Sequence, residues 1–218
     1  MVARSPLDGP LTAALLPVLL LAAPDRDPAA VLKTLEDAGR ALKTLQADFV
    51  ETKVIVLLDD REESRGSLIM QIPRRLRWNY ETPRPSVMLI KDGRFTRYIP
   101  ASKQVFRGAA KGDADLLVGF GPGAAGLGKK YEVTLVGEEA VEGRSTHVLD
   151  LKPKAGQSGL FSGIRLWVDK ERSIPIQTRL TEPTGDHTTI RFEKVRINEA
   201  LPAKVFDLDL PGDVVELK

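Results

Sequence analysis

The chain has 218 residues, of which 42% are hydrophobic and 28% charged, and it contains no cysteine. This composition is typical of one globular domain, and the missing thiols exclude disulfides, thiolate metal sites, cysteine nucleophiles and lipid attachment through cysteine. The net charge is only +2, from 32 Lys and Arg against 30 Asp and Glu. Nucleic-acid-binding domains usually show a strongly basic surface, so we expect no nucleic-acid partner.

The first 23 residues are typical of a secretory signal peptide. Arg4 precedes a short apolar run over residues 11–23, and a polar segment follows directly. A positive charge, a short apolar core and small residues at its end define such leaders, and the run is shorter than the ~20 residues of a spanning helix. We predict a signal peptide over residues 1–23 and one domain over residues 24–218, with an uncleaved anchor as the alternative.

An amphipathic helix is expected to begin at Pro28, because Asp27 before it is a favourable start. Leucines then recur at helical spacing, namely Leu32, Leu35, Leu42 and Leu45. One face of this helix must pack on the rest of the domain.

Residues 66–93 predict β-strands with one apolar face. Apolar side chains recur at every second position, at Leu68, Met70 and Ile72 and again at Leu76, Trp78 and Tyr80, and a period of two is the signature of a strand. Pro73 and Pro83 interrupt the runs, as proline does between strands. Further strands are expected over residues 47–58, 94–99, 103–106, 131–138, 143–153, 163–169, 175–181 and 188–198, with a charged hairpin loop over residues 59–63.

About eleven strands joined by short connections, with no βαβ alternation, favour an antiparallel meander. Open sheets much beyond ten strands tend to curl or close. We therefore predict a mainly β (α+β) protein built on one large curled antiparallel sheet.

Residues 108–130 break the strand pattern. Leu116, Leu117, Val118 and Phe120 predict a helical turn or two, and five glycines follow between positions 119 and 128. A mobile lid with glycine hinges is the interpretation we favour, and a plain flexible loop is the alternative. A phosphate-binding loop is disfavoured because no Gly-Lys-Ser/Thr pattern accompanies the glycines.

Residues with catalytic or metal-binding chemistry are scarce. His147 and His187 are the two histidines, and the sequence has no Gly-x-Ser-x-Gly motif. We therefore predict no catalytic residue, no metal, no cofactor and no enzymatic activity. Arg74, Arg75 and Arg77 near Trp78 would suit stacking on single-stranded nucleic acid, but a solvated strand face or a docking patch for a protein accounts for them equally.

A curled sheet with an apolar inner face and a lid describes a container. An acyl chain gains about 0.8 kcal/mol for each buried CH₂, so such a cavity holds lipid without any catalytic group. The predicted lid residues are Leu116, Leu117 and Phe120, and the predicted lipid-binding cavity residues are Phe49, Leu68, Met70, Ile72, Leu76, Trp78, Tyr80, Val87 and Leu89.

The chain resembles the periplasmic lipoprotein carriers of the LolA type over residues 32–215. The resemblance rests on the order of several motifs: LQADFVETK, GSLIMQIPRRLRWNYETP, PSVMLIKDGRFTRYIP, YEVTLVG, GIRLWVDKERSIPIQTRLTEPTG and FDLDLPG. It implies an incomplete antiparallel barrel closed by a helical lid, which holds the acyl chains of lipoproteins. It also implies a soluble, monomeric periplasmic carrier between an inner-membrane ABC-type release complex and an outer-membrane lipoprotein receptor.

Individual positions follow the family unequally. Leu76 matches a large apolar residue at the cavity mouth, and Trp78 matches the aromatic residue two positions on. Ile72 stands where family members often carry an arginine that hydrogen-bonds to the lid, so that gating contact is not carried over. The alternatives are a carrier of another lipid or glycolipid and a structural or sensor module. A hydrolase of envelope lipids lacks a nucleophile–base pair here.

Overall fold

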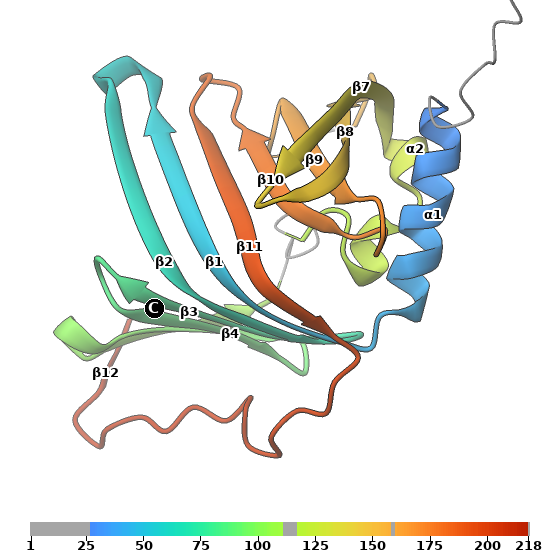
Figure 1. Ribbon diagram of the computed structural model, residues 1–218. Helices are drawn as coiled ribbons and strands as arrows, with labels where there is room; N and C mark the ends of the chain where they lie inside the picture. The colour runs from blue at the N-terminus through green and yellow to red at the C-terminus, as the bar shows by residue number, and fades with distance from the viewer. Residues whose placement is uncertain (1–26, 111–116, 158–159, 218) are drawn as a thin grey trace, which may run out of the picture.

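The computed structural model describes residues 27–110, 117–157 and 160–217 (Figure 1). The predicted leader and Leu116 of the predicted lid lie outside these residues. Beside the strands, the described parts form two α-helices, α1 (Pro28–Ala41) and α2 (Leu127–Lys130), and short 3₁₀ helices that include η2 (Val56–Leu58), η3 (Pro100–Ser102) and η5 (Gly121–Ala124). The strands are β1 (Thr44–Ile55), β2 (Asp60–Gln71), β3 (Arg75–Thr82), β4 (Ser86–Lys91), β5 (Arg94–Ile99), β6 (Gln104–Ala109), β7 (Tyr131–Val141), β8 (Arg144–Pro153), β9 (Gly163–Asp169), β10 (Pro175–Thr181), β11 (His187–Ile197) and β12 (Val215–Leu217).

Twelve strands in the described ranges form one sheet, in the order β12-β6-β5-β4-β3-β2-β1-β11-β10-β9-β8-β7. The pairs are antiparallel except β12 with β6, which is parallel. The sheet curls strongly, and its end strands β7 and β12 do not pair with each other, so the barrel is incomplete (Figure 1). The predicted curled antiparallel sheet is confirmed, and the predicted strands over residues 163–169 and 175–181 match β9 and β10 at both ends.

The inner, concave face of the sheet carries the apolar side chains that recur with a period of two. On β1 this face presents Leu45, Ala47 and Phe49, all buried. Leu68 lies opposite Ala47 on β2, and Trp78 lies opposite Leu68 on β3. Directly opposed residues of antiparallel strands share a face, so one continuous apolar surface runs across the strands.

Helix α1 begins as the sequence predicts and ends earlier. The Asp27 carboxylate accepts a hydrogen bond from the Ala29 N–H at 2.9 Å and caps the first turn. At the other end Leu42 is already extended, and Leu45 belongs to β1, opposite Met70. The helical spacing of Leu42 and Leu45 is therefore coincidental: both are buried, Leu42 in the link between α1 and β1 and Leu45 within β1.

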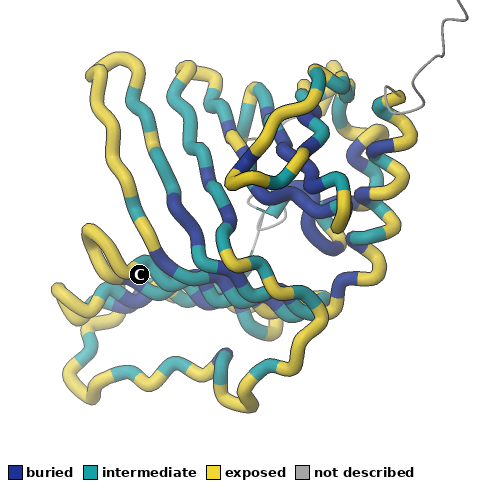
Figure 2. The backbone as a smooth tube through the Cα atoms, viewed as in Figure 1, coloured by how far each residue is buried: buried dark blue, intermediate teal, exposed yellow. Residues whose placement is uncertain are grey.

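The tip of the β1–β2 hairpin is apolar rather than charged, so the predicted loop over residues 59–63 is wrong. The turn is η2 followed by Asp59 in the left-handed region (φ 48°), and Ile55 pairs with Asp60. An aspartate tolerates this conformation, which closes the turn early and moves the charged run onto β2. Leu57 at the tip is 91% exposed, and Figure 2 shows the whole tip as exposed.

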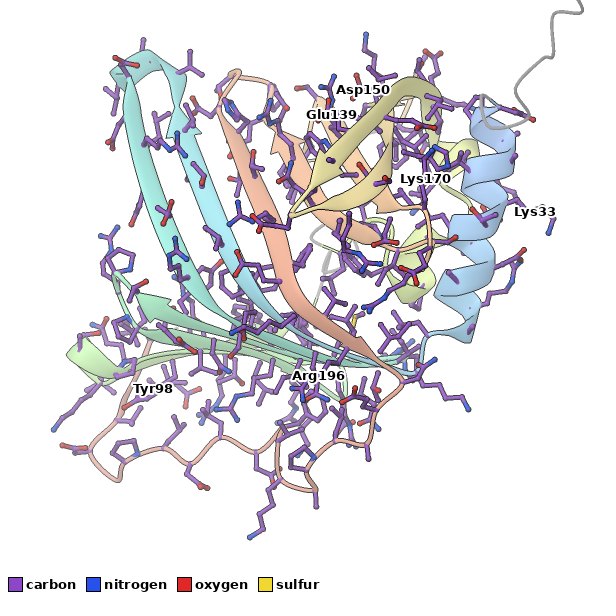
Figure 3. All side chains as sticks on the ribbon, in the orientation of Figure 1. Lys33, Tyr98, Glu139, Asp150, Lys170 and Arg196 are labelled. Atoms are coloured by element: carbon purple, nitrogen blue, oxygen red, sulfur yellow. The ribbon has the colours of Figure 1, made fainter. Side chains whose placement is uncertain are left out.

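The C-terminal segment crosses the outer, convex face of the sheet and ends in β12 beside β6 (Figure 1). Phe206 is buried against this face, and Arg77 donates hydrogen bonds to the carbonyl oxygens of Val205 and Asp207, each at 3.0 Å. Tyr98, labelled in Figure 3, is buried on the same convex side. The segment therefore covers apolar side chains that the convex face would otherwise expose to water.

Val87 and Leu89 lie on this convex face, so their prediction as cavity residues is wrong. On β4 the residues opposite Trp78 and Leu76 are Met88 and Ile90, which share the concave face. Leu89 instead lines the space under the C-terminal segment. Four successive apolar residues on β4 conceal the alternation, and a shift of one residue in register moves every side chain to the other face.

Replacing Phe206 with alanine should lower the free energy of unfolding by about 3 kcal/mol, because a buried aromatic side chain is lost from the convex face. Urea unfolding measures the change. The Asp209→Ala control in the same segment is exposed and should change stability by less than about 0.5 kcal/mol. Equal effects at both positions would contradict an anchoring role for Phe206.

Candidate functional site

A cavity of about 400 Å³ lies between the concave face and the segment that contains η5. Its volume falls in the range of small-ligand pockets. Apolar side chains of the sheet form one wall and the segment forms the other, with Arg74 and Arg75 at the rim of the β2–β3 turn. The apolar lining side chains are Met70, Ile72, Leu76, Ile90, Leu117 and Phe120.

Most of the predicted cavity residues lie together. Phe49, Leu68, Met70, Leu76 and Trp78 belong to one buried cluster that also contains Phe120 of the predicted lid. Ile72, Tyr80 and Leu117 pack against this cluster. The structure thus places them on one face, while their contact with a lipid stays a prediction.

Sequence reasoning missed part of the cavity wall. Ile90 and Ala110 line the cavity, and Met88, Phe95 and Phe192 pack on the same cluster. The alternation of Phe95 with Arg94 and Thr96 on β5 was the available signal. On β4, apolar residues stand on both faces, so the sequence carried no such signal.

The helical part of the lid is not where the apolar run predicts it. The described part of that run, residues 117–120, forms a turn, and the helical turns η5 and α2 come afterwards, within the glycine-rich stretch. Gly121 (φ 48°), the first residue of η5, and Gly126 (φ 72°), which precedes α2, adopt the left-handed region. Glycine adopts this region without strain, so the glycines shape the lid and the apolar residues fill the core. We call residues 117–130 the lid segment.

The lid segment packs on α1 with almost no space between the backbones. A Cβ atom added to Gly39 would lie 2.8 Å from both the Ala124 Cβ and the Gly121 carbonyl oxygen. The Glu36 carboxylate accepts a hydrogen bond from the Gly126 N–H at 3.0 Å. Helix α1 therefore holds the lid segment by close backbone contact and one side-chain hydrogen bond.

Ile72 contacts the lid segment from the sheet side. A Cβ on Gly121 would lie 2.5 Å from the Ile72 Cδ1 atom, and the Ile72 N–H donates to the Lys43 carbonyl oxygen at 2.9 Å. The side chain at this position thus meets the lid through an aliphatic contact rather than through a polar one.

An aromatic group continues the concave face away from the lid. The Phe49 ring lies 5.1 Å from Trp78 and 5.3 Å from Tyr80, between ring centroids. The Tyr80 hydroxyl donates a hydrogen bond to Glu51 at 3.0 Å. Burial raises the pKa of the Glu51 carboxyl, and burial together with the Glu51 charge raises the pKa of the Tyr80 hydroxyl.

Potential metal ligands do not gather in the described ranges. Those ranges hold no group of three or more His, Asp or Glu side chains placed to bind a metal ion. His147 lies on β8, and His187 is the first residue of β11. No helix in the described ranges is long and apolar enough to span a membrane.

The structure is an open antiparallel sheet whose apolar concave face is covered by a helix and a glycine-rich lid segment. This arrangement defines a class of cavity-forming β proteins. The chain belongs to the family described as "Outer membrane lipoprotein carrier protein LolA", whose profile matches residues 40–209. The resemblance seen in the sequence motifs is confirmed.

Curated relatives agree with this assignment, and a solved structure agrees with the fold. The chain is 29% identical to the "Outer-membrane lipoprotein carrier protein" of Chromobacterium violaceum over 215 residues, 96% of each chain. It is 29% identical to the protein of the same name from Dechloromonas aromatica over 190 residues, 86% of this chain and 88% of that protein. An uncharacterized conserved protein from Thermus thermophilus superposes with a TM-score of 0.55 at 13% identity, covering 87% of this chain and 98% of that one, which supports the fold alone.

The Gly39→Ala variant should loosen the lid segment. Alanine favours a helix by about 1 kcal/mol over glycine, yet here the new methyl group meets Ala124 and Gly121, and such overpacking costs about 1–3 kcal/mol. Hydrogen exchange of residues 121–130 should accelerate. Gly128→Ala is the control, because its Cβ would meet Leu32 at an ordinary 3.6 Å. A more stable Gly39→Ala protein with unchanged exchange would contradict the packing argument.

The Glu51→Gln variant should be more stable than the parent protein at neutral pH, with the difference vanishing toward pH 4. Because burial raises the pKa of Glu51 in the folded state, its protonation stabilises the fold, and that stabilisation is lost as pH rises through the raised pKa. Glutamine stays neutral and still accepts the Tyr80 hydrogen bond. Urea unfolding between pH 4 and pH 7 measures the difference, with exposed Glu81→Gln as the control for a lost charge.

Proposed function

We propose that this protein is a periplasmic carrier that holds the acyl chains of lipoproteins in the cavity and carries them from the inner to the outer membrane. The observation that carries the proposal is the cavity of about 400 Å³ between the concave face and the lid segment, in which Met70, Leu76 and Ile90 line the sheet side and Gln71, Arg74 and Arg75 add polar groups. Membership of the LolA family and the names of the curated relatives support the lipoprotein as cargo.

The energetics of such a carrier need only apolar contact. Each buried methylene contributes about 0.8 kcal/mol, so ten of them give about 8 kcal/mol of gross stabilisation. Leu76 and Ile90, which line the cavity, are nearly fully buried. A long acyl chain therefore enters by displacing the lid segment, and it replaces the contacts that this segment makes with the sheet.

We propose that the lid segment moves. It is held to α1 by the Gly39 contact and the Glu36 hydrogen bond, and Ile72 touches it from the sheet. Gly121 and Gly126 in left-handed conformations sit at the starts of its two helical turns. Loops that open and close over ligands commonly use a few such positions as hinges.

The remaining features of the proposal follow from the family. We propose that the carrier is monomeric and non-enzymatic, receives lipoproteins from an inner-membrane ABC-type release complex and delivers them to an outer-membrane lipoprotein receptor. Residues 1–23 would direct export and be removed, which leaves the domain over residues 24–218 with a lid over residues 108–130.

A carrier of a different lipid is the second candidate, and the contact made by Ile72 favours it. An aliphatic side chain meets the lid segment where many family members have an arginine. The contact that holds the lid segment over a ligand therefore differs. The mass of the species that co-purifies with the protein from periplasm separates the two candidates.

Mass spectrometry of the protein purified from periplasm should detect bound lipoprotein or lipid, and the purified protein should take up a fluorescent fatty-acyl probe. Leu117→Glu places a charge in the cavity wall and should weaken probe uptake at least about tenfold, because an unpaired charge in an apolar site is costly. The matched control is Leu57→Glu, at the exposed hairpin tip. A protein that is always empty and takes up no probe is not an acyl carrier.

A further inference from the structure

A second pocket, which we call the polar pocket, lies at the opposite ends of the same strands. Its volume is about 380 Å³, and it is formed by the ends of β1, β2 and β3, the start of β4, the last residues of β5 and the β3–β4 turn. In Figure 1 this turn lies on the side of the sheet away from α1. The side chains that matter here are Glu51, Lys53, Ser64, Tyr80, Ser86 and Arg97.

The polar pocket and the apolar cavity open on one face. Glu51 follows Phe49 by two residues on β1, and Tyr80 follows Trp78 by two on β3, so all four side chains face the concave side. Arg97 is opposite Met88, which is opposite Trp78. Leu76 in the cavity and Tyr80 in the polar pocket are four residues apart on one strand, about 13 Å at the rise of a β-strand.

The polar pocket carries three cations, Lys53, Arg84 and Arg97, and two carboxylates, Glu51 and Glu62. Lys53 lies opposite Glu62, and its charge also acts on Glu51. Arg84 pairs with Glu62 across its rim. Glu51 is engaged by the Tyr80 hydroxyl, and burial disfavours its charge. Lys53 and Arg97 form no ion pair or side-chain hydrogen bond within the described ranges. Two cationic side chains, with the hydroxyls of Ser64 and Ser86 beside them, thus offer donors to a ligand.

A buried donor lies between the two pockets. Trp78 is 2% exposed, and its Nε1–H has no hydrogen-bond partner within the described ranges. A buried donor left without an acceptor costs about 1–3 kcal/mol. Trp78 lies on β3 between Leu76 of the cavity and Tyr80 of the polar pocket, and it lines neither. A ligand that spanned both pockets would bring the ester or amide carbonyl between its chain and its head close to this donor.

We propose that the polar pocket binds the anionic head of an amphiphile whose acyl chain lies in the apolar cavity, so that Lys53 and Arg97 select an acidic head and orient the chain toward the lid. This proposal rests on the proposed function, since it assigns the head of the same cargo. The acidic group is a phosphate or a carboxylate, carried by a lipid headgroup or by an acidic residue that follows the acylated end of a polypeptide.

Two pairs of palmitoyl ligands test the proposal by isothermal titration calorimetry. Each ligand is used at a concentration at which it is monomeric rather than micellar. The first pair is palmitoyl lysophosphatidic acid and monopalmitoylglycerol, and the second is an N-palmitoyl peptide with Asp or with Asn beside the acylated residue. We expect the acidic member of at least one pair to bind about fivefold more tightly, since a partly exposed ion pair contributes about 1 kcal/mol. Raising the salt concentration should reduce that preference.

The double variant Lys53→Gln with Arg97→Gln should bind both members of a pair equally while it keeps the affinity for the neutral one. Arg94→Gln is the matched control, because Arg94 lies on the same strand with its side chain on the convex face, and it should keep the preference. Lys53, Arg94 and Arg97 are all exposed, so unchanged thermal unfolding midpoints confirm that the variants fold.

A preference in the phosphate pair alone assigns the head to a lipid, and a preference in the peptide pair alone assigns it to a lipoprotein. Equal binding of acidic and neutral members by the parent protein would contradict the proposal that the polar pocket binds an acidic head. A preference that survives the double variant would contradict it as well. Neither result would affect the proposal that the protein carries acyl chains. Failure of all four ligands to bind overturns both proposals.

Discussion

Burial of the concave apolar face is the constraint on which the rest of this structure depends. A twelve-stranded sheet with this curl leaves β7 and β12 unpaired with each other, so the strands alone cannot enclose the side chains on the inner face. Helix α1 and the lid segment complete the enclosure, and Leu35 of α1 and Leu127 of α2 join the same buried cluster as Leu68 and Leu166. The cavity lies between this cover and the sheet.

The two parts of the cover are held by different contacts. Helix α1 leads into β1 and is capped by Asp27. The lid segment packs closely on Gly39, donates a hydrogen bond from Gly126 to Glu36 and buries apolar side chains, among them Phe120 and Leu127, in the core. A small displacement would break the contact at Gly39, because α1 and the lid segment approach so closely there that no side chain larger than that of glycine fits. The same face then changes character along the strands, from Leu76 at the lid to Tyr80 and Glu51 at the far end.

Much of the fold was predictable where a local rule applied. The period of two from Leu68 to Tyr80, broken at Pro73, identified β2 and β3 and their shared apolar face, and the turn residues on either side of β9 and β10 defined those strands. The candidate site was predictable to the same extent, because Met70, Leu76 and Trp78 lie on strands with clear alternation. The prediction of Val87 and Leu89 as cavity residues was wrong. Strand β4 is apolar on both sides, so the residues that face the cavity depend on its register with β3.

The sequence by itself determined that this chain forms a curled antiparallel sheet with one apolar face, an N-terminal helix and a glycine-rich interruption, because each follows from periodicity or from the backbone freedom of glycine and proline. Only the tertiary structure decided which residues of β4 face inward, that the apolar tail after β11 covers the convex face, and that Gly39 and Ile72 meet the lid segment. These features depend on strand register and on contacts between segments distant in sequence, which no local pattern encodes.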